Sequence, residues 1–215
     1  FEFLNLGYAA YLDFFGFLKE QFPTIPDQAI AKMVQGVEVD LFRPDDELKK
    51  LAKLAVRLGV ADALKAGTAD EALARIGAAP NGGEWLKAWK DAQDPWFNFT
   101  SGNGFYSTDK YWIENPDIPL GYIRDYIAKL EKGEEIDRPT EKIARERDRI
   151  TAEYAELLPE ELRPVFEGKL GLARTVFPYV ENHNFYIEHW SMGVFWRKMR
   201  ELSAILHEEG FWENP

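Results

Sequence analysis

Cysteine is absent from this chain of 215 residues. Its absence excludes disulfides, thiol catalysis and every metal or iron–sulfur site that needs a cysteine ligand. The chain also lacks an uninterrupted apolar run of the roughly 18 residues that span a bilayer. Its first residues, F-E-F-L-N-L-G-Y, lack the basic segment of a secretion signal. We therefore expect a cytoplasmic protein without a membrane partner.

Positive charge is also scarce, with 26 Lys and Arg against 37 Asp and Glu and a formal net charge of −11. Nucleic acids and anionic membranes are bound by clustered positive surfaces that release counterions. In this sequence the basic residues stand among acidic ones. We therefore expect no nucleic-acid partner.

Alternating apolar and polar residues bounded by turn dipeptides, the pattern typical of strands, do not occur. Apolar residues recur instead at helical spacing, and prolines and capping residues separate the periodic stretches. The expected fold is all-α, a multi-helix bundle with long C-terminal helices and an aromatic-rich loop. The predicted helices cover 4–21, 27–34, 47–58, 69–77, 84–92, 119–132, 140–157, 159–177 and 180–210.

We expect one helical domain over 1–215, with smaller helices in 1–135 and a bundle of long helices in 138–210. The chain opens without an initiator methionine and ends just beyond a helix. The expectation is therefore a fragment of a longer polypeptide.

Aromatic residues are abundant, with seven Trp, nine Tyr and 15 Phe. They indicate a pocket for a flat apolar ligand, a domain interface or an aromatic core. The segment 94–112, D-P-W-F-N-F-T-S-G-N-G-F-Y-S-T-D-K-Y-W, has no trusted period and must bury its rings against the core or a ligand. We interpret it as a structured loop beside a pocket.

The predicted helix over 180–210 contains all three histidines. At 100° per residue one side is the expected core stripe. Its members are Phe185, Met192, Phe195, Met199, Leu202 and Leu206. The other side carries His183, Tyr186, Trp190 and Arg197.

Two interpretations of that second side remain open. In one, a histidine takes a proton from a hydroxyl, because the imidazole pKa lies near neutrality, and Arg197 neutralises a phosphate or carboxylate. In the other, His183 stabilises the helix start and Arg197 pairs with Glu201, four residues on. Glu188 and His189 are adjacent and cannot face one ion in the manner of an i, i+4 pair, so no metal site is predicted.

The motif E-N-H-N-F-Y-I-E-H-W, with the run to H-E-E-G-F-W-E-N-P, resembles part of the phosphoenolpyruvate-utilising dikinase superfamily. The loop W-F-N-F-T-S-G-N-G-F-Y-S-T-D-K-Y-W is similar to that of its phenylphosphate-synthase-like branch, which is related to rifampicin phosphotransferases. In that family an ATP-grasp domain splits ATP, a histidine on a swivelling domain carries the phosphoryl group, and a helical domain presents the acceptor hydroxyl. This chain resembles only the helical domain.

The resemblance implies that this domain binds no cofactor and that ATP and magnesium belong to the complete enzyme. Its implied partners are the ATP-grasp and swivelling phosphohistidine domains, on the same chain or on a partner subunit. The contexts E-N-H-N, I-E-H-W and I-L-H-E do not match the family's phosphohistidine motif. None of the three histidines is therefore expected to carry phosphate.

The implied activity is ATP-driven phosphorylation of the hydroxyl of phenol or a related small aromatic. His183 or His189 would accept the proton, and Arg197 would bind the substrate. Ring packing is assigned to Phe97, Phe99, Phe105, Tyr106, Tyr186 and Trp190. The alternatives are a different alcohol or an antibiotic as acceptor, or a non-catalytic docking module of a multidomain dikinase-like protein.

Overall fold

The computed structural model describes residues 2–102, 104 and 106–213, and this part of the chain is helical without strands. The expected all-α fold is confirmed. None of the described helices is both long and apolar enough to cross a membrane. The chain divides into two compact units, each made of two separate segments.

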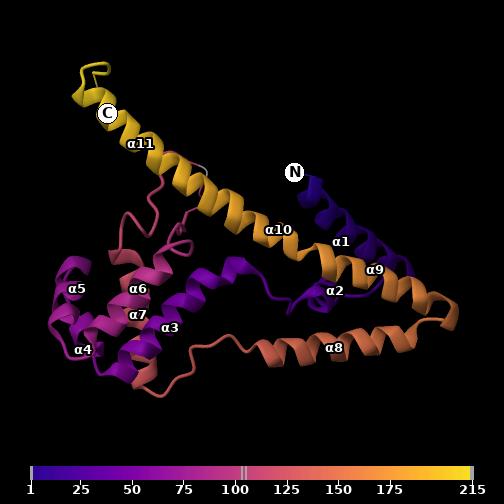
Figure 1. Ribbon diagram of the computed structural model, residues 1–215. Helices are drawn as coiled ribbons and strands as arrows, with labels where there is room; N and C mark the ends of the chain where they lie inside the picture. The colour runs from indigo at the N-terminus through magenta and orange to yellow at the C-terminus, as the bar shows by residue number, and fades with distance from the viewer. Residues whose placement is uncertain (1, 103, 105, 214–215) are drawn as a thin grey trace. The chain divides into compact units, whose positions relative to one another are not determined.

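Unit 1 comprises Phe1–Asp40 and Arg138–His183. Its helices are α1 (Glu2–Gln21), α2 (Asp27–Val34), α8 (Thr140–Leu157), the 3-10 turn η2 (Glu160–Leu162), α9 (Arg163–Val176) and α10 (Pro178–His183). Helix α1 packs on α9 and α10, and α2 packs on α8 (Figure 1). The core between them includes Phe14, Leu18, Ile30, Met33, Phe166 and Leu170.

Helix α1 is less buried than its composition suggests. Apolar residues at three- and four-residue spacing, Tyr8 and Leu12 among them, together with Phe14 and Phe17 on a second face, predict a buried helix here. The side chains of Tyr8 and Leu12 are 49% and 62% exposed, whereas Phe14 and Leu18 are fully buried. That part of the prediction is wrong because α1 has its partners in unit 1 on one side, where Gly7 lies against Val180 of α10.

Unit 2 comprises Leu41–Asp137 and Asn184–Pro215. After the 3-10 turn η1 (Asp40–Phe42), its helices are α3 (Arg43–Leu58), α4 (Ala61–Leu64), α5 (Ala69–Ala78), α6 (Gly82–Gln93), α7 (Asp117–Glu131), the π-helix η3 (Asn184–Ser191) and α11 (Met192–Glu208). Helix α3 packs against α6 and α7, and α5 packs against α6. The core here includes Leu48, Leu51, Ile76, Trp85, Phe97 and Ile123.

Local signals in the sequence set several of these helix ends. Helix α3 has Pro44 in its first turn and stops at Gly59, whose φ of 70° is favoured by glycine. Helix α5 begins with a capping box, in which the Thr68 hydroxyl accepts from the Glu71 N–H and the Glu71 carboxylate accepts from the Thr68 N–H. The spacing of Thr68 and Glu71 predicts this capping box, and the structure confirms it.

The cores group the helices differently from the expected separation at 138. Helices α8 and α9 share their apolar core with α1 and α2, at the other end of the sequence. Helices α8 and α9 are therefore not part of a separate bundle, because their apolar stripes are covered by α1 and α2.

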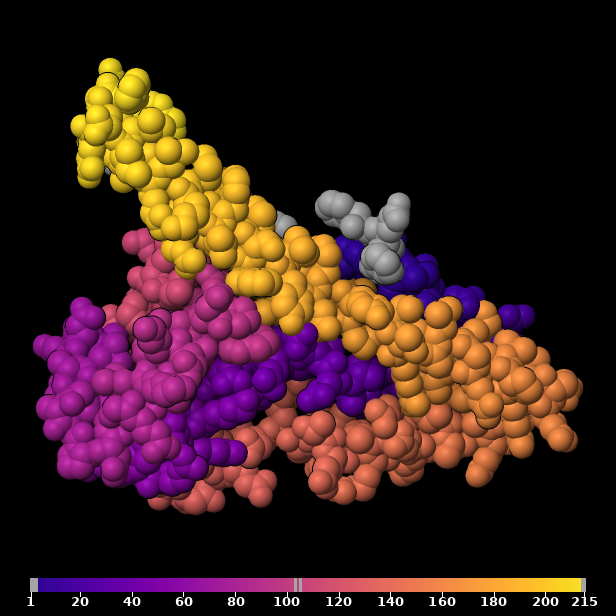
Figure 2. Space-filling view, in the orientation of Figure 1, coloured from indigo at the N-terminus to yellow at the C-terminus, as the bar shows by residue number. Residues whose placement is uncertain are grey.

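The helix expected over 180–210 is present as α10, η3 and α11 in succession. Its predicted core stripe holds at Phe185, which is fully buried, but fails further on. Phe195, Met199 and Leu202 are 49%, 38% and 44% exposed. Periodicity correctly identified an apolar face on this helix. Along the last turns of α11, drawn in yellow in Figure 2, no described helix of unit 2 packs over that face.

Candidate functional site

The aromatic loop between α6 and α7 is fastened to η3 and α11 within unit 2. The ring of Phe99 stacks on that of His189, with centroids 4.3 Å apart, and Trp96 stacks on Phe185 at 5.1 Å. The Arg43 guanidinium lies 5.2 Å from the Trp96 ring centroid. Segments about ninety residues apart thus share one aromatic contact zone.

The η3 segment is a π-helix, a form that is rare and frequently found at functional sites. The Ser191 hydroxyl donates to the Tyr186 carbonyl over 2.7 Å. Within this segment Phe185 and His189 are buried, while the rings of Tyr186 and Trp190 meet edge to face with centroids 5.9 Å apart. The π-helix therefore directs two rings into the loop contact and leaves two at its margin.

Arg197 of α11 bonds to the loop. Its Nη1 donates to Oδ1 of Asn98 at 2.9 Å, and Nδ2 of Asn98 donates to Oδ1 of Asp94 at 3.1 Å. The same Asp94 oxygen accepts from Nε1 of Trp190 at 3.3 Å. Arg197 thus anchors the loop, and Glu201 pairs with Lys198, so the alternative Arg197–Glu201 pair is not formed.

Arg200 makes a second anchor, which sequence reasoning missed. Its Nη1 donates to the Ser107 carbonyl and its Nη2 to Oε1 of Glu114, both at 2.6 Å. Glu114 Oε2 accepts the backbone N–H of Tyr111 at 3.1 Å, and the Tyr111 hydroxyl donates to the Gly104 carbonyl at 2.9 Å. In the sequence, only the aromatic content of the loop indicated that it would make such contacts.

Two glycines allow the close approach of loop and helix. Gly104 has φ +78°, and a Cβ there would lie 2.4 Å from the Glu188 carbonyl oxygen. At Gly193 a Cβ would lie 2.7 Å from Cε1 of the buried Tyr111. Real Cβ atoms essentially never come so near, so any larger residue at either position must push the loop away.

His189 lies buried at the centre of this contact. Its Nδ1 accepts the backbone N–H of Thr100 at 3.4 Å, which places the proton of the neutral ring on Nε2. Burial lowers the pKa of His189 to about 4, although the negative charge of Asp109 acts in the opposite direction. The imidazole is therefore neutral near pH 7 and a weak base, which fits a loop anchor better than the predicted proton acceptor.

The remaining predicted residues fall into different environments. Phe97 is fully buried in the core, with its ring beside Trp89 and Trp112 at 4.8 and 6.2 Å. Tyr106 is 63% exposed, and Phe105 lies outside the described residues. His183 is the last residue of α10 and belongs to unit 1, whereas His189 belongs to unit 2.

A groove of about 420 Å³ lies beside the second anchor. It is lined by Ser107, Trp196, Met199, Arg200, Ser203 and Trp212. The indole Nε1 of Trp196 is buried and has no hydrogen-bond partner in the described part of the chain. The same holds for Oδ2 of Asp109 in the loop. Buried polar atoms are normally paired, so the Trp196 N–H is an unsatisfied buried donor.

No protein-family model, no curated protein and no solved structure matches this chain. The dikinase resemblance therefore rests on the quoted motifs and stays a prediction.

Proposed function

We propose that this chain is the acceptor-binding part of an ATP-dependent phosphotransferase that phosphorylates the hydroxyl of phenol or a related small aromatic. A phosphohistidine on another domain would supply the phosphoryl group. The ATP-grasp and swivelling domains would bind ATP and magnesium. The role of this chain would be to bind the acceptor.

The observation that carries the proposal is the packing of the loop on η3 and α11. The two segments with the family-like motifs lie far apart in the sequence, yet their rings and hydrogen bonds join them in unit 2. The groove beside them is lined by two tryptophans and an arginine, and the indole N–H of Trp196 is buried without a partner among the described residues. A flat ring with one oxygen matches those features.

The proposed chemistry is mainly positioning. A phenol hydroxyl is a modest nucleophile, so the site must orient the oxygen in line with phosphorus and exclude water, which would hydrolyse the phosphohistidine. Trp196 and Arg200 line the proposed site, whereas Phe97, to which the sequence assigned ring packing around the substrate, lies in the core. His189 holds the loop, and the role of His183, which belongs to unit 1, stays a prediction from the sequence.

The test is a titration of the chain with phenol, followed by tryptophan fluorescence and calorimetry. We expect saturable binding that Trp196→Ala weakens about tenfold, because an aromatic contact and an N–H donor are lost together. The matched control is Tyr8→Ala, which removes a half-exposed ring from unit 1. Cyclohexanol, which has the hydroxyl without the flat ring, should bind more weakly than phenol.

A specific observation also favours the docking-module alternative. Besides the exposed face of α11, Phe211 and Trp212 beyond it are 75% and 46% exposed. Large apolar side chains gathered on one surface are typical of an interface. Absence of saturable phenol binding at millimolar concentration would reject the acceptor site and leave docking of a neighbouring domain as the better account.

A further inference from the structure

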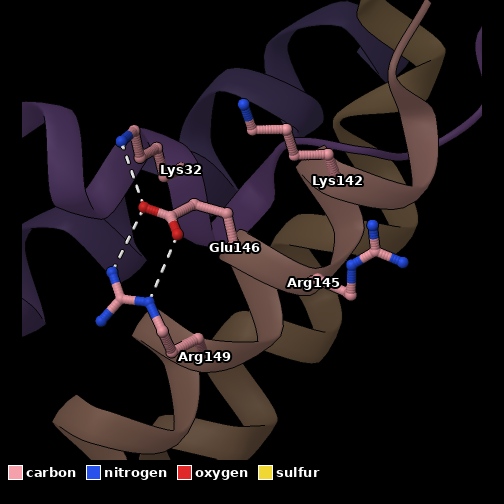
Figure 3. Close-up of a pocket in the computed structure, with 5 residues that line it drawn as sticks. All are labelled: Lys32, Lys142, Arg145, Glu146 and Arg149. Carbon is pink, nitrogen blue, oxygen red and sulfur yellow. Dashed lines mark hydrogen bonds and ion pairs between the residues drawn. The ribbon is translucent and has the colours of Figure 1, made fainter.

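Unit 1 contains a basic pocket that the proposed acceptor site does not involve. Its volume is about 420 Å³, and it lies where α8 packs on α2 (Figure 3). Its lining is Lys32 of α2 with Lys142, Arg145, Glu146 and Arg149 of α8. Four cations and one carboxylate thus line the pocket, in a chain whose formal net charge is −11.

Glu146 is shared between two of the cations. Its Oε1 lies 3.4 Å from Nζ of Lys32 and 3.2 Å from Nη2 of Arg149, and its Oε2 accepts from Nε of Arg149 at 3.2 Å. These contacts, chiefly the hydrogen bond from Arg149, hold the pKa of Glu146 below its usual value. The carboxylate is therefore charged at neutral pH and fixes a lysine and an arginine at the pocket.

Lys142 has no hydrogen bond or ion pair to any residue that the structure describes, and Figure 3 draws no contact from its ammonium. It is the third residue of α8, where a positive charge opposes the helix dipole. Outside the pocket, Arg145 pairs with Glu141, and Arg149 pairs with Glu153. The positive charge of Lys142 is thus not neutralised by an ion pair, and it does not stabilise α8.

We propose that this pocket binds a small phosphate-bearing molecule, a diphosphate or a phosphate ester. The ammonium groups of Lys32 and Lys142 contact its oxygens, and the Arg149 guanidinium adds positive charge beside them. A multivalent oxyanion suits the site because several cations face a space as large as ordinary ligand pockets.

The probe is pyrophosphate, titrated calorimetrically into the full chain at low ionic strength, with sodium chloride at equal ionic strength as reference. We expect saturable binding that Lys142→Ala and Lys32→Ala each weaken about five- to tenfold, as loss of one charge-assisted contact does. Lys90→Ala, which removes an exposed lysine of α6 in unit 2, should leave the affinity unchanged. Circular dichroism checks that each variant remains folded.

Glu146→Gln separates ligand binding from a structural ion-pair cluster. Removing this negative charge relieves its repulsion of the ligand, so pyrophosphate affinity should rise severalfold. If the cluster serves only to join α2 to α8, the same change lowers stability and confers no gain in affinity. No binding, binding that Lys142→Ala leaves intact, or equal weakening by Lys90→Ala each overturns the proposal.

Discussion

The His189 ring takes part in a stacking contact and a hydrogen bond, and it is buried. One face of the ring stacks on Phe99, its Nδ1 accepts the backbone N–H of Thr100, and burial disfavours its charged form. A protonated ring would donate at Nδ1 as well, and two donors would then meet across the Thr100 contact. Protonation should therefore loosen the loop from η3.

The first prediction concerns the pH dependence of stability. An unfolded histidine titrates near 6.5, and burial lowers the pKa of His189 to about 4 in the folded chain. Between these values the unfolded state binds more protons, so the free energy of unfolding falls as pH falls. We expect His189 to contribute a loss of about 1–2 kcal/mol between pH 6.5 and 4, after allowing for partial solvent screening.

Urea denaturation at a series of pH values measures this slope. His189→Gln should flatten it above pH 5, where few carboxylates titrate, because glutamine cannot take up the proton. The matched control is His207→Gln at the exposed histidine of α11. If His189→Gln keeps the parent slope, the ring is not held neutral by its surroundings.

Residue types were easier to predict than residue partners. The sequence singled out Arg197, but its partner Asn98 is 99 residues away, and Arg200 and Glu114 are 86 apart. No local pattern marks pairs of that separation. The predicted Arg197–Glu201 pair followed from helical spacing alone, whereas Asn98 offers an acceptor that is itself held by Asp94.

At the scale of elements, local rules predicted much of the helix map. The prediction 140–157 coincides with α8, and 27–34 coincides with α2. Both helices follow prolines and have ends that neighbouring residues determine. The π-helix at 184–191 was not predicted, because a 100° period assumes the regular α-helical repeat throughout.

The second prediction tests the close approach of loop and helix. Gly193→Ala places a methyl group against the buried ring of Tyr111, at a nominal 2.7 Å from Cε1. The ring cannot yield freely, because its hydroxyl is bonded to the Gly104 carbonyl. We expect a loss of about 1–3 kcal/mol in the free energy of unfolding, measured with urea.

Gly121→Ala is the matched control. Gly121 lies in α7, and an added Cβ would meet no atom within 4 Å. Alanine is favoured over glycine in a helix, so this change should stabilise the protein by about 0.5–1 kcal/mol. Equal effects of the two substitutions would show that helix propensity, not the Tyr111 contact, governs position 193.

At the scale of the whole molecule, two separate apolar cores are present. One joins α1 and α2 to α8 and α9, and the other is built from residues between Leu48 and Ile127. The sequence predicted the helices but not this partition. Which apolar stripes pair depends on tertiary contact between distant segments, which periodicity does not encode.

The distribution of tryptophan makes the partition measurable. All seven tryptophans lie in the segments of unit 2, at 85, 89, 96, 112, 190, 196 and 212. Tryptophan fluorescence therefore reports on unit 2 alone. Far-ultraviolet circular dichroism reports on both units, because both are helical.

The third prediction is that the two cores unfold independently. Phe166→Ala empties a fully packed site in the core of unit 1 and should lower the stability of that unit by about 3–5 kcal/mol. The circular dichroism transition should then split or broaden toward lower urea, while the fluorescence midpoint stays in place. Ile76→Ala, in the other core, should lower the fluorescence midpoint because it costs unit 2 about 2–5 kcal/mol.

The pair of variants distinguishes two cooperative units from one. In a single cooperative fold, a cavity anywhere lowers the unfolding midpoint seen by every probe equally. The midpoints by fluorescence and circular dichroism then coincide. A fluorescence midpoint that moves with Phe166→Ala as far as with Ile76→Ala would contradict independent unfolding. A stationary midpoint would show that the tryptophan-rich unit folds without support from the core that α1, α2, α8 and α9 share.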